Sequence, residues 1–302
     1  MEPNRPRGRA AGVFCALAGG CLWGFSGSCG QYLFQNKALT SDFIVPWRLL
    51  LGGVLLLLFL CARRGPRAVF AIWRTPRHAR ALAVFGVFGM TGCQYTYLTA
   101  IQYSNAGTAT VLQYLSPTLI MLLLCLRGRR WPTGLETFVV LLDLAGIFLI
   151  ATHGDPTAFA MSPEALFWGL LSAVFAVLYT LAPGELLARY EGALVVGWGM
   201  LLGGVVMMVW KRPWTLGQTV DGEALFFIAL IILLGSIAAF TLYLEGVKRL
   251  GPGPASLLSS VEPVSAALIA VTWLGVRLTV PDVLGFVCIL LTVLLLALRK
   301  TS

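Results

Sequence analysis

Residues 97–118, YLTAIQYSNAGTATVLQYLSPT, align without a gap with residues 243–264, YLEGVKRLGPGPASLLSSVEPV, at an offset of 146 positions. The two stretches agree at 6 of 22 positions, whereas about one or two matches are expected by chance at ordinary residue frequencies. The matches include one pair of glycines and one pair of prolines, Pro117 and Pro263. These two pairs carry most weight, because apolar residues match easily by chance in an apolar chain. We therefore predict that the chain is an internal duplication.

The composition places the chain in a lipid bilayer. Of its 302 residues, 58% are hydrophobic and 12% are charged, and the mean hydropathy is +0.84. Apolar runs long enough to cross about 30 Å of hydrocarbon recur along the whole sequence. We predict an all-α membrane protein with ten transmembrane helices, near residues 11–34, 43–61, 81–102, 106–126, 134–152, 164–182, 194–210, 224–247, 254–274 and 279–298.

The positions of the basic residues predict the orientation of these helices. With the N-terminus in the cytoplasm, 17 of the 22 Lys and Arg residues fall on the cytoplasmic side, and only Lys37, Lys211, Arg212 and Arg277 fall in outer loops. This asymmetry is what orients helices during insertion. We expect a multi-pass protein of the cell membrane with both termini in the cytoplasm, and the charge of +9 needs no nucleic-acid partner.

Duplication of five helices forces an inverted arrangement. The first copy spans residues 1–152, after a short basic tail, and the second spans residues 153–302. Because five is odd, the second copy enters the membrane from the opposite face. In such inverted repeats the binding site lies near the middle of the membrane, between the copies, and rocking of one copy against the other gives alternating access.

The sequence contains no pattern typical of a cofactor, a metal site or nucleotide hydrolysis. Its seven cysteines lie in or at the ends of apolar segments and are interpreted as small packing residues. His78 and His153 fall on opposite sides of the predicted membrane, so they do not form a zinc site. The glycine-rich stretches do not match the phosphate-binding loop of nucleotide hydrolases. We predict no cofactor, no metal and no catalytic residue.

Several motifs resemble one family of membrane proteins. The WGFSG of Trp23–Gly27, Arg48, the stretch 97–118 and the Glu-Pro-Val of residues 262–264 together are similar to the EamA branch of the drug/metabolite transporter superfamily. The resemblance covers nearly the whole chain. It implies ten helices in two inverted five-helix repeats and a central cavity lined mainly by helices 1, 3, 4, 6, 8 and 9. It also implies export or exchange of small organic metabolites, including amino acids.

Glu262 is the sharpest candidate for a binding residue. It falls about eight residues into the ninth predicted helix, and a carboxylate at that depth costs several kcal/mol unless it finds a partner, water or a proton. One interpretation is a group that binds a substrate amine or cation, or that takes up a proton to couple transport. The alternative is a protonated glutamic acid that is hydrogen-bonded inside the bundle and holds a bend at Pro263.

Pro117 and Pro263 are predicted to act as hinges. Each proline lacks an N–H group, so the carbonyl oxygens of Gln113 and Ser259, four residues earlier, lose their helical donor. These oxygens need another partner in hydrocarbon, and where they line a cavity they form a polar site. The alternative is a packing kink that a neighbouring helix satisfies.

A wall of aromatic and polar side chains is predicted around the cavity. Gln94 and Tyr97 lie three residues apart and therefore on one face of the third helix. Their partners in the duplication are Phe240 and Tyr243. With these four, the predicted substrate-binding residues are Glu262, Trp23, Gln113, Tyr179 and Ser259. For each of them, ordinary core packing is the alternative interpretation.

Two charged residues inside predicted helices have a different interpretation. Arg48 lies about five residues inside the outer end of the second helix, so we expect it to extend to water or to pair with Asp42. Asp143 lies in the middle of the fifth helix, which the family resemblance places at the periphery. The sequence assigns Asp143 no role.

The sequence favours a secondary transporter or facilitator that exports amino acids or similar small organic metabolites. It would be driven by the substrate gradient or by proton exchange through Glu262, and its partners would be a small-molecule substrate and membrane lipids. The protein is predicted to be a monomer or a homodimer and not an enzyme. The alternatives are an intramembrane enzyme acting on a lipid-like substrate and a membrane assembly subunit that transports nothing.

Overall fold

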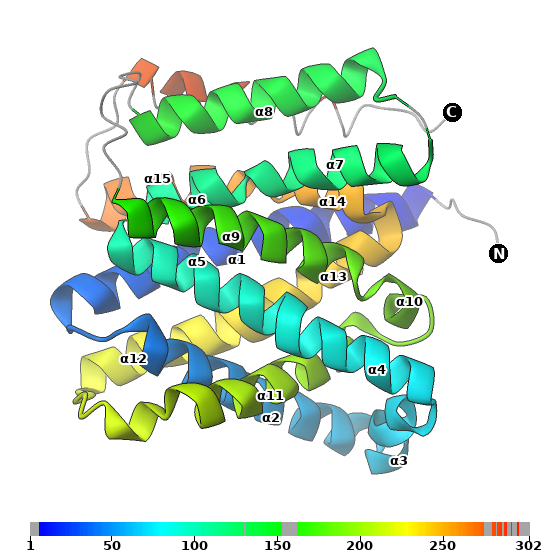
Figure 1. Ribbon diagram of the computed structural model, residues 1–302, viewed down its shortest axis with the longest axis vertical. Coiled ribbons are helices and arrows are strands. Elements are labelled where there is room, and N and C mark those ends of the chain that lie inside the picture. The colour runs from blue at the N-terminus through cyan, green and yellow to red at the C-terminus, as the bar shows by residue number, and fades with distance from the viewer. Residues whose placement is uncertain are drawn as a thin grey trace.

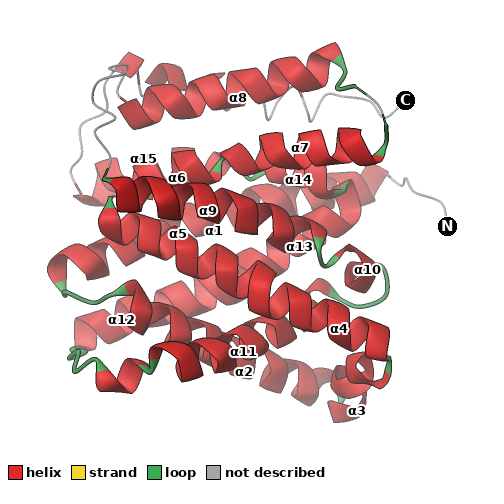
Figure 2. Cartoon of the chain, in the orientation of Figure 1, coloured by secondary structure: helices red, strands yellow, loops and turns green. Residues whose placement is uncertain are grey.

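The structure is a bundle of helices. The computed structural model describes residues 6–104, 106–129, 131–152 and 162–274, with scattered residues between 280 and 295, and these contain no strand (Figure 2). The helices of the N-terminal half are α1 (Pro6–Asn36), α2 (Ser41–Arg64), α3 (Pro66–Val69), α4 (Pro76–Val84), α5 (Thr91–Tyr103), α6 (Ala106–Gln113), α7 (Leu115–Arg127) and α8 (Gly134–Thr152). Those of the C-terminal half are α9 (Pro163–Leu181), α10 (Gly184–Leu187), α11 (Gly192–Lys211), α12 (Gly222–Leu230), α13 (Ala239–Leu250), α14 (Pro252–Leu258) and α15 (Val261–Leu274).

The predicted helical segments coincide with helical stretches wherever the structure describes them. The first nine segments match, with α4 and α5 forming the third and α12 and α13 the eighth. The tenth, 279–298, and the boundary at residue 153 lie outside the continuously described residues. Within the described residues, five helical stretches are individually long and apolar enough to span a membrane: Gly8–Asn36, Ser41–Arg64, Pro163–Leu187, Gly192–Thr215 and Gly222–Leu250.

Large apolar side chains cover the outside of the bundle. Leu58, Phe138, Leu141, Val209 and Leu225 are all more than half exposed. Water does not favour so many exposed apolar side chains on different helices, whereas the hydrocarbon interior of a membrane does. The outer surface therefore fits a protein surrounded by lipid.

The helices that enclose the centre come from both halves of the chain. Helix α1 packs against α13 and α15, and α9 packs against α5, α6 and α7. Helix α8 lies at one edge of the bundle and the pair α2 and α11 lies at the opposite edge (Figure 1). In the same view α1 begins on the right and α9 ends on the right, so these two helices run in opposite directions.

The irregularities of the helices recur at a fixed spacing. The helix that contains α4 and α5 has a π-helical segment, η2 (Phe85–Met90), and the helix that contains α12 and α13 has another, η5 (Ile231–Ala238). Their first residues are 146 positions apart. Helices α6 and α7 are separated at Tyr114, and α14 and α15 are separated at Ser259 and Ser260, again about 146 positions later. The spacing is the one found in the sequence alignment.

Two glycines allow α2 and α11 to pack closely. A Cβ atom added at Gly204 would lie 2.5 Å from the backbone nitrogen of Leu50, and one added at Gly53 would meet the backbone of Leu201. Real Cβ atoms do not approach backbone atoms so closely. The bare backbone at these positions is therefore part of the contact between the two halves.

We expect Gly204→Ala to destabilise the protein by about 1–3 kcal/mol, because α2 and α11 must separate to admit the methyl group. The measurement is thermal unfolding of the purified protein in detergent, followed by tryptophan fluorescence. Gly134→Ala is the matched control, since nothing lies within 4 Å of a Cβ at that position. Equal melting temperatures for the two variants would show that the close contact is not needed.

Candidate functional site

A cavity lies where helices of the two halves meet. It contains about 680 Å³ of atom-free space, a volume that includes its opening to the outside. Its lining comes from α1, α2, α5, α6, α7, α9, α13, α14 and α15. This set includes the helices that the family resemblance implies, with α2 in addition.

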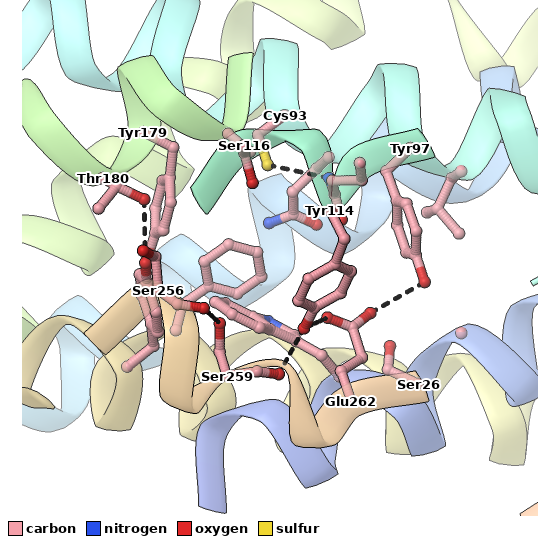
Figure 3. A pocket seen from close by; sticks show the side chains of 18 of the residues that line it. Ser26, Cys93, Tyr97, Tyr114, Ser116, Tyr179, Thr180, Ser256, Ser259 and Glu262 are labelled. Carbon is pink, nitrogen blue, oxygen red and sulfur yellow. Dashed lines mark hydrogen bonds between the residues drawn. The ribbon is translucent and has the colours of Figure 1, made fainter. Parts of the chain in front are cut away.

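The nine residues predicted to bind substrate all line this cavity. They are Trp23, Gln94, Tyr97, Gln113, Tyr179, Phe240, Tyr243, Ser259 and Glu262. Figure 3 shows several of them converging from different helices. Residues far apart in the sequence are thus brought together, and their role in binding stays a prediction.

Glu262 is held by two tyrosine hydroxyl groups from the other half of the chain. Its side chain is 3% exposed. The Tyr97 hydroxyl donates to Oε1 at 3.0 Å and the Tyr114 hydroxyl donates to Oε2 at 3.2 Å (Figure 3). Because α14 and α15 are separate helices, Glu262 lies in the first turn of α15, where the helix dipole stabilises a negative charge. The interruption explains how a carboxylate is tolerated at this depth.

Tyr114 was not predicted from the sequence. It lies between α6 and α7, and its hydroxyl group is also within hydrogen-bond distance of the carbonyl oxygen of Ser259. The sequence predicts that this oxygen needs a partner other than its helical donor. Tyr114 is one such partner, and the backbone N–H of Glu262, at 2.9 Å, is another. The signal available in the sequence was the position of Tyr114, next to Gln113 and three residues before Pro117.

The two predicted hinge prolines stand just after interruptions. Pro117 is the third residue of α7 and Pro263 is the third residue of α15. Proline is tolerated in the first turn of a helix, because the N–H groups there have no helical acceptor. Each site is therefore a break between two helices rather than a bend within one, and movement at these breaks stays a prediction.

Four aromatic rings lie against one another along one side of the cavity. The ring of Trp23 lies 4.9 Å from that of Phe240 and 4.8 Å from that of Tyr243, and the Tyr179 ring lies 5.1 Å from that of Phe240. The Tyr243 hydroxyl is 3.0 Å from Thr180 Oγ1. We call Trp23, Tyr179, Phe240 and Tyr243 the aromatic wall.

Several buried polar atoms at the cavity have no hydrogen-bond partner among the described residues. They are Trp23 Nε1, Ser26 Oγ, Gln94 Oε1 and Tyr179 Oη. Buried polar groups in native proteins are nearly always paired with protein, water or a ligand. Donors and acceptors without protein partners around one cavity are therefore typical of a site that receives a polar ligand.

The expected position of Arg48 is wrong. Its side chain neither reaches water nor pairs with Asp42, but is 4% exposed and lines the cavity. Nε donates to Ser236 Oγ at 2.5 Å and Nη2 donates to the Gly235 carbonyl at 3.1 Å. Asp42 instead accepts from Tyr95 and pairs with Lys211. Arg48 was misplaced because α2 is covered by α11 and η5, which close its route to water.

Asp143, to which the sequence assigned no role, is buried beside the interruption between α14 and α15. It is 1% exposed, and its Oδ2 accepts a hydrogen bond from Ser260 Oγ at 3.1 Å. Ser260 follows Ser259 in the interruption itself. Asp143 thus joins the peripheral helix α8 to the segment that positions Glu262.

Comparison with known proteins identifies the family. The model of the EamA-like transporter family matches residues 10–152 and 164–298. An uncharacterized inner membrane transporter of Salmonella typhimurium, YicL, is 38% identical over 287 residues, covering 95% of each chain. An uncharacterized Bacillus subtilis transporter, YcbK, is 24% identical and covers 94% of this chain and 92% of its own.

The fold also matches a solved structure. One crystal structure superimposes with a TM-score of 0.77 at 18% sequence identity, covering 97% of this chain and 96% of that one. This likeness concerns the fold alone. The apolar outer surface and the family match make the chain a multi-pass membrane protein. By its sequence, the chain belongs to the EamA-like transporter family.

Proposed function

We propose that this protein is a secondary transporter that exports amino acids or similar small organic metabolites by alternating access through the central cavity. The observation that carries the proposal is the hydrogen bonding of Glu262, from the C-terminal half, to Tyr97 and Tyr114, from the N-terminal half. Because Glu262 is hydrogen-bonded to the other half, movement of the two halves changes the surroundings of this carboxylate. Movement of the halves is therefore linked to binding in the cavity.

The packing supports two equivalent halves in opposite orientations. If α1 corresponds to α9 and α5 to α13, the contact of α1 with α13 corresponds to that of α9 with α5. Both contacts are present, and α2 packs on its own counterpart α11. The opposite directions of α1 and α9 and the recurrence of the π-helical segments at the 146-residue spacing agree with this relation. Inverted repeats of this kind are how many transporters achieve alternating access.

Glu262 and its partners support proton exchange as the driving reaction. The Tyr114 hydroxyl has one proton and two acceptors, the Ser259 carbonyl and Glu262 Oε2. With Glu262 ionised, Tyr114 donates to Oε2. With Glu262 protonated on Oε2, the acid donates to Tyr114, which then donates to Ser259. The same side chains therefore satisfy both protonation states.

Ion pairs connect the two halves at both ends of the bundle. At one end, Lys37 Nζ lies 2.7 Å from Asp221 Oδ2 and 2.5 Å from Glu223 Oε2. At the other, Arg77 Nε lies 2.9 Å from Glu185 Oε1. The hydrogen bond from Lys37 lowers the pKa of Asp221, so this pair is lost only in acid and stays formed at neutral pH. We propose that these pairs open and re-form as access alternates.

We expect Lys37→Glu to lower the transport rate about twofold to fivefold, since exposed ion pairs contribute about 0–1 kcal/mol. The double variant Lys37→Glu/Glu223→Lys should recover most of the rate, because it restores an ion pair with the charges exchanged. Initial rates in proteoliposomes are the measurement. A double variant no faster than the single one would show that this pair does not contribute to transport.

The proposal is tested by reconstituting the purified protein in liposomes preloaded with unlabelled amino acids and measuring entry of the labelled compounds. We expect exchange above that of protein-free liposomes, with the solute recovered chemically unchanged. A modified product would instead indicate the intramembrane enzyme. No movement of amino acids, organic acids, amines, sugars or nucleosides by folded protein would contradict transport altogether.

A further inference from the structure

Arg48 is a buried cation that forms no ion pair with any described residue. Its side chain is 4% exposed, and none of the ion pairs formed by the described residues includes it. A guanidinium group has five N–H donors. The two contacts to Ser236 and Gly235 use two of them, so three have no protein acceptor in the described part of the chain. Burying a charge in this way is costly unless something compensates it.

The two protein contacts fix the direction of the guanidinium group. Both acceptors belong to the π-helical segment η5, on one side of Arg48. Arg48 also lines the cavity. The guanidinium group is therefore anchored on one side, and its remaining N–H donors are available to the cavity. A planar guanidinium group can bind a carboxylate with two parallel hydrogen bonds.

The same cavity contains one carboxylate and a large apolar surface. Among the described residues that line it, Glu262 is the only acidic one and Arg48 is the only basic one. Glu262 belongs to α15 and Arg48 to α2, on different walls. Tyr97 and Tyr114 engage one lone pair on each oxygen of Glu262, which leaves acceptor capacity for an ammonium group. The aromatic wall completes the lining with rings suited to an apolar side chain.

We infer that Arg48 binds the carboxylate of the solute while Glu262 binds its ammonium group, so the substrate is a free α-amino acid with an apolar or aromatic side chain. This inference rests on the proposed transport function. It adds a residue, Arg48, and two requirements: the solute carries both charges, and its side chain occupies the aromatic wall. An amine without a carboxylate leaves the buried cation uncompensated. An acid without an ammonium group leaves Glu262 without its ligand.

Two matched sets of compounds test the inference. The first is phenylalanine, 2-phenylethylamine and 3-phenylpropanoate, and the second is leucine, 3-methylbutylamine and 4-methylpentanoate. Within each set the apolar group is constant. We expect one or both amino acids to stabilise the purified protein against heat and to inhibit exchange in proteoliposomes. The corresponding amine and acid should bind at least 10-fold more weakly.

Variants of Arg48 separate binding from folding. Arg48→Lys keeps the charge but loses the planar pair of donors, and it should weaken amino-acid binding about 10- to 100-fold while reducing the difference between amino acid and amine. Ser236→Ala is the matched control, since it removes the Nε acceptor but keeps the guanidinium group, and it should weaken binding less. Melting temperatures without ligand report folding for both variants.

Two binding results would overturn the inference. The first is an amine that binds as tightly as its amino acid, and the second is a folded Arg48→Lys variant with unchanged amino-acid affinity. Transport of amines, sugars or nucleosides in place of amino acids would also overturn it while the proposed transport function stands. Absence of transport of every class of solute would contradict the function itself, so the two failures are distinguishable.

Discussion

Glu262→Gln is expected to reduce transport about 100-fold. The substitution keeps the size of the side chain and its ability to accept hydrogen bonds from Tyr97 and Tyr114. It removes the one acidic group among the described residues of the cavity lining. Losing one member of a buried, hydrogen-bonded charge pair costs about 2–5 kcal/mol, and each 1.4 kcal/mol is a factor of about 10 in affinity. Both the binding of an ammonium group and the exchange of a proton are lost.

The measurement is the initial rate of exchange in proteoliposomes, with solute affinity from thermal stabilisation. Glu164→Gln is the matched control, because Glu164 is exposed in the first turn of α9 and lies outside the cavity. It should transport like the unaltered protein. A folded Glu262→Gln variant that exchanges solute at the normal rate would show that the carboxylate is structural only.

Tyr114→Phe is expected to reduce transport about 10- to 100-fold. The hydroxyl group contacts both the Ser259 carbonyl and Glu262, so its removal leaves two buried acceptors with one donor fewer. An unsatisfied buried group costs about 1–3 kcal/mol, and more when it is charged. The loss falls at the interruption between α14 and α15, where Glu262 is positioned. Exchange rates and melting temperatures are the two measurements.

Tyr103→Phe provides the comparison for this variant, because Tyr103 lies at the end of α5 with half of its surface exposed. Its rate and its melting temperature should both stay unchanged. If Tyr114→Phe behaves like Tyr103→Phe, then Tyr114 does not position Glu262. If Tyr114→Phe melts normally but transports slowly, the hydroxyl group acts on the site rather than on folding.

The sequence predicted the helical segments well because membrane helices are defined by length and hydropathy. The segment 134–152 coincides with α8, and 164–182 differs from α9 by one residue at each end. The sequence did not predict the π-helical segments η2 and η5, since no residue type marks a change from i→i+4 to i→i+5 bonding. It did place Pro117 and Pro263 at irregular backbone, but as bends rather than complete breaks.

Part of the candidate site could be predicted from the chemistry of its residues. Intramembrane carboxylates and matched aromatic positions are conspicuous, so Glu262 and Tyr243 were found and they do line the cavity. Tyr114 and Arg48 were not predicted to line the cavity. Their helices are apolar on every face, so hydropathy does not indicate which face points inward. For Arg48, depth along the helix suggested access to water. The packing of α11 and η5 around α2 removes that access.

Alternating access requires that one cavity between the halves opens to each side of the membrane in turn. Cys93 lines this cavity and hydrogen-bonds with Gln113 Nε2 at 3.6 Å. The most direct measurement retains Cys93, replaces the other six cysteines by alanine, and applies a membrane-impermeant thiol reagent to each face of oriented vesicles. We expect Cys93 to be labelled from both faces, and we expect transported solute to slow both reactions. Labelling from one face only, in an active protein, would contradict it.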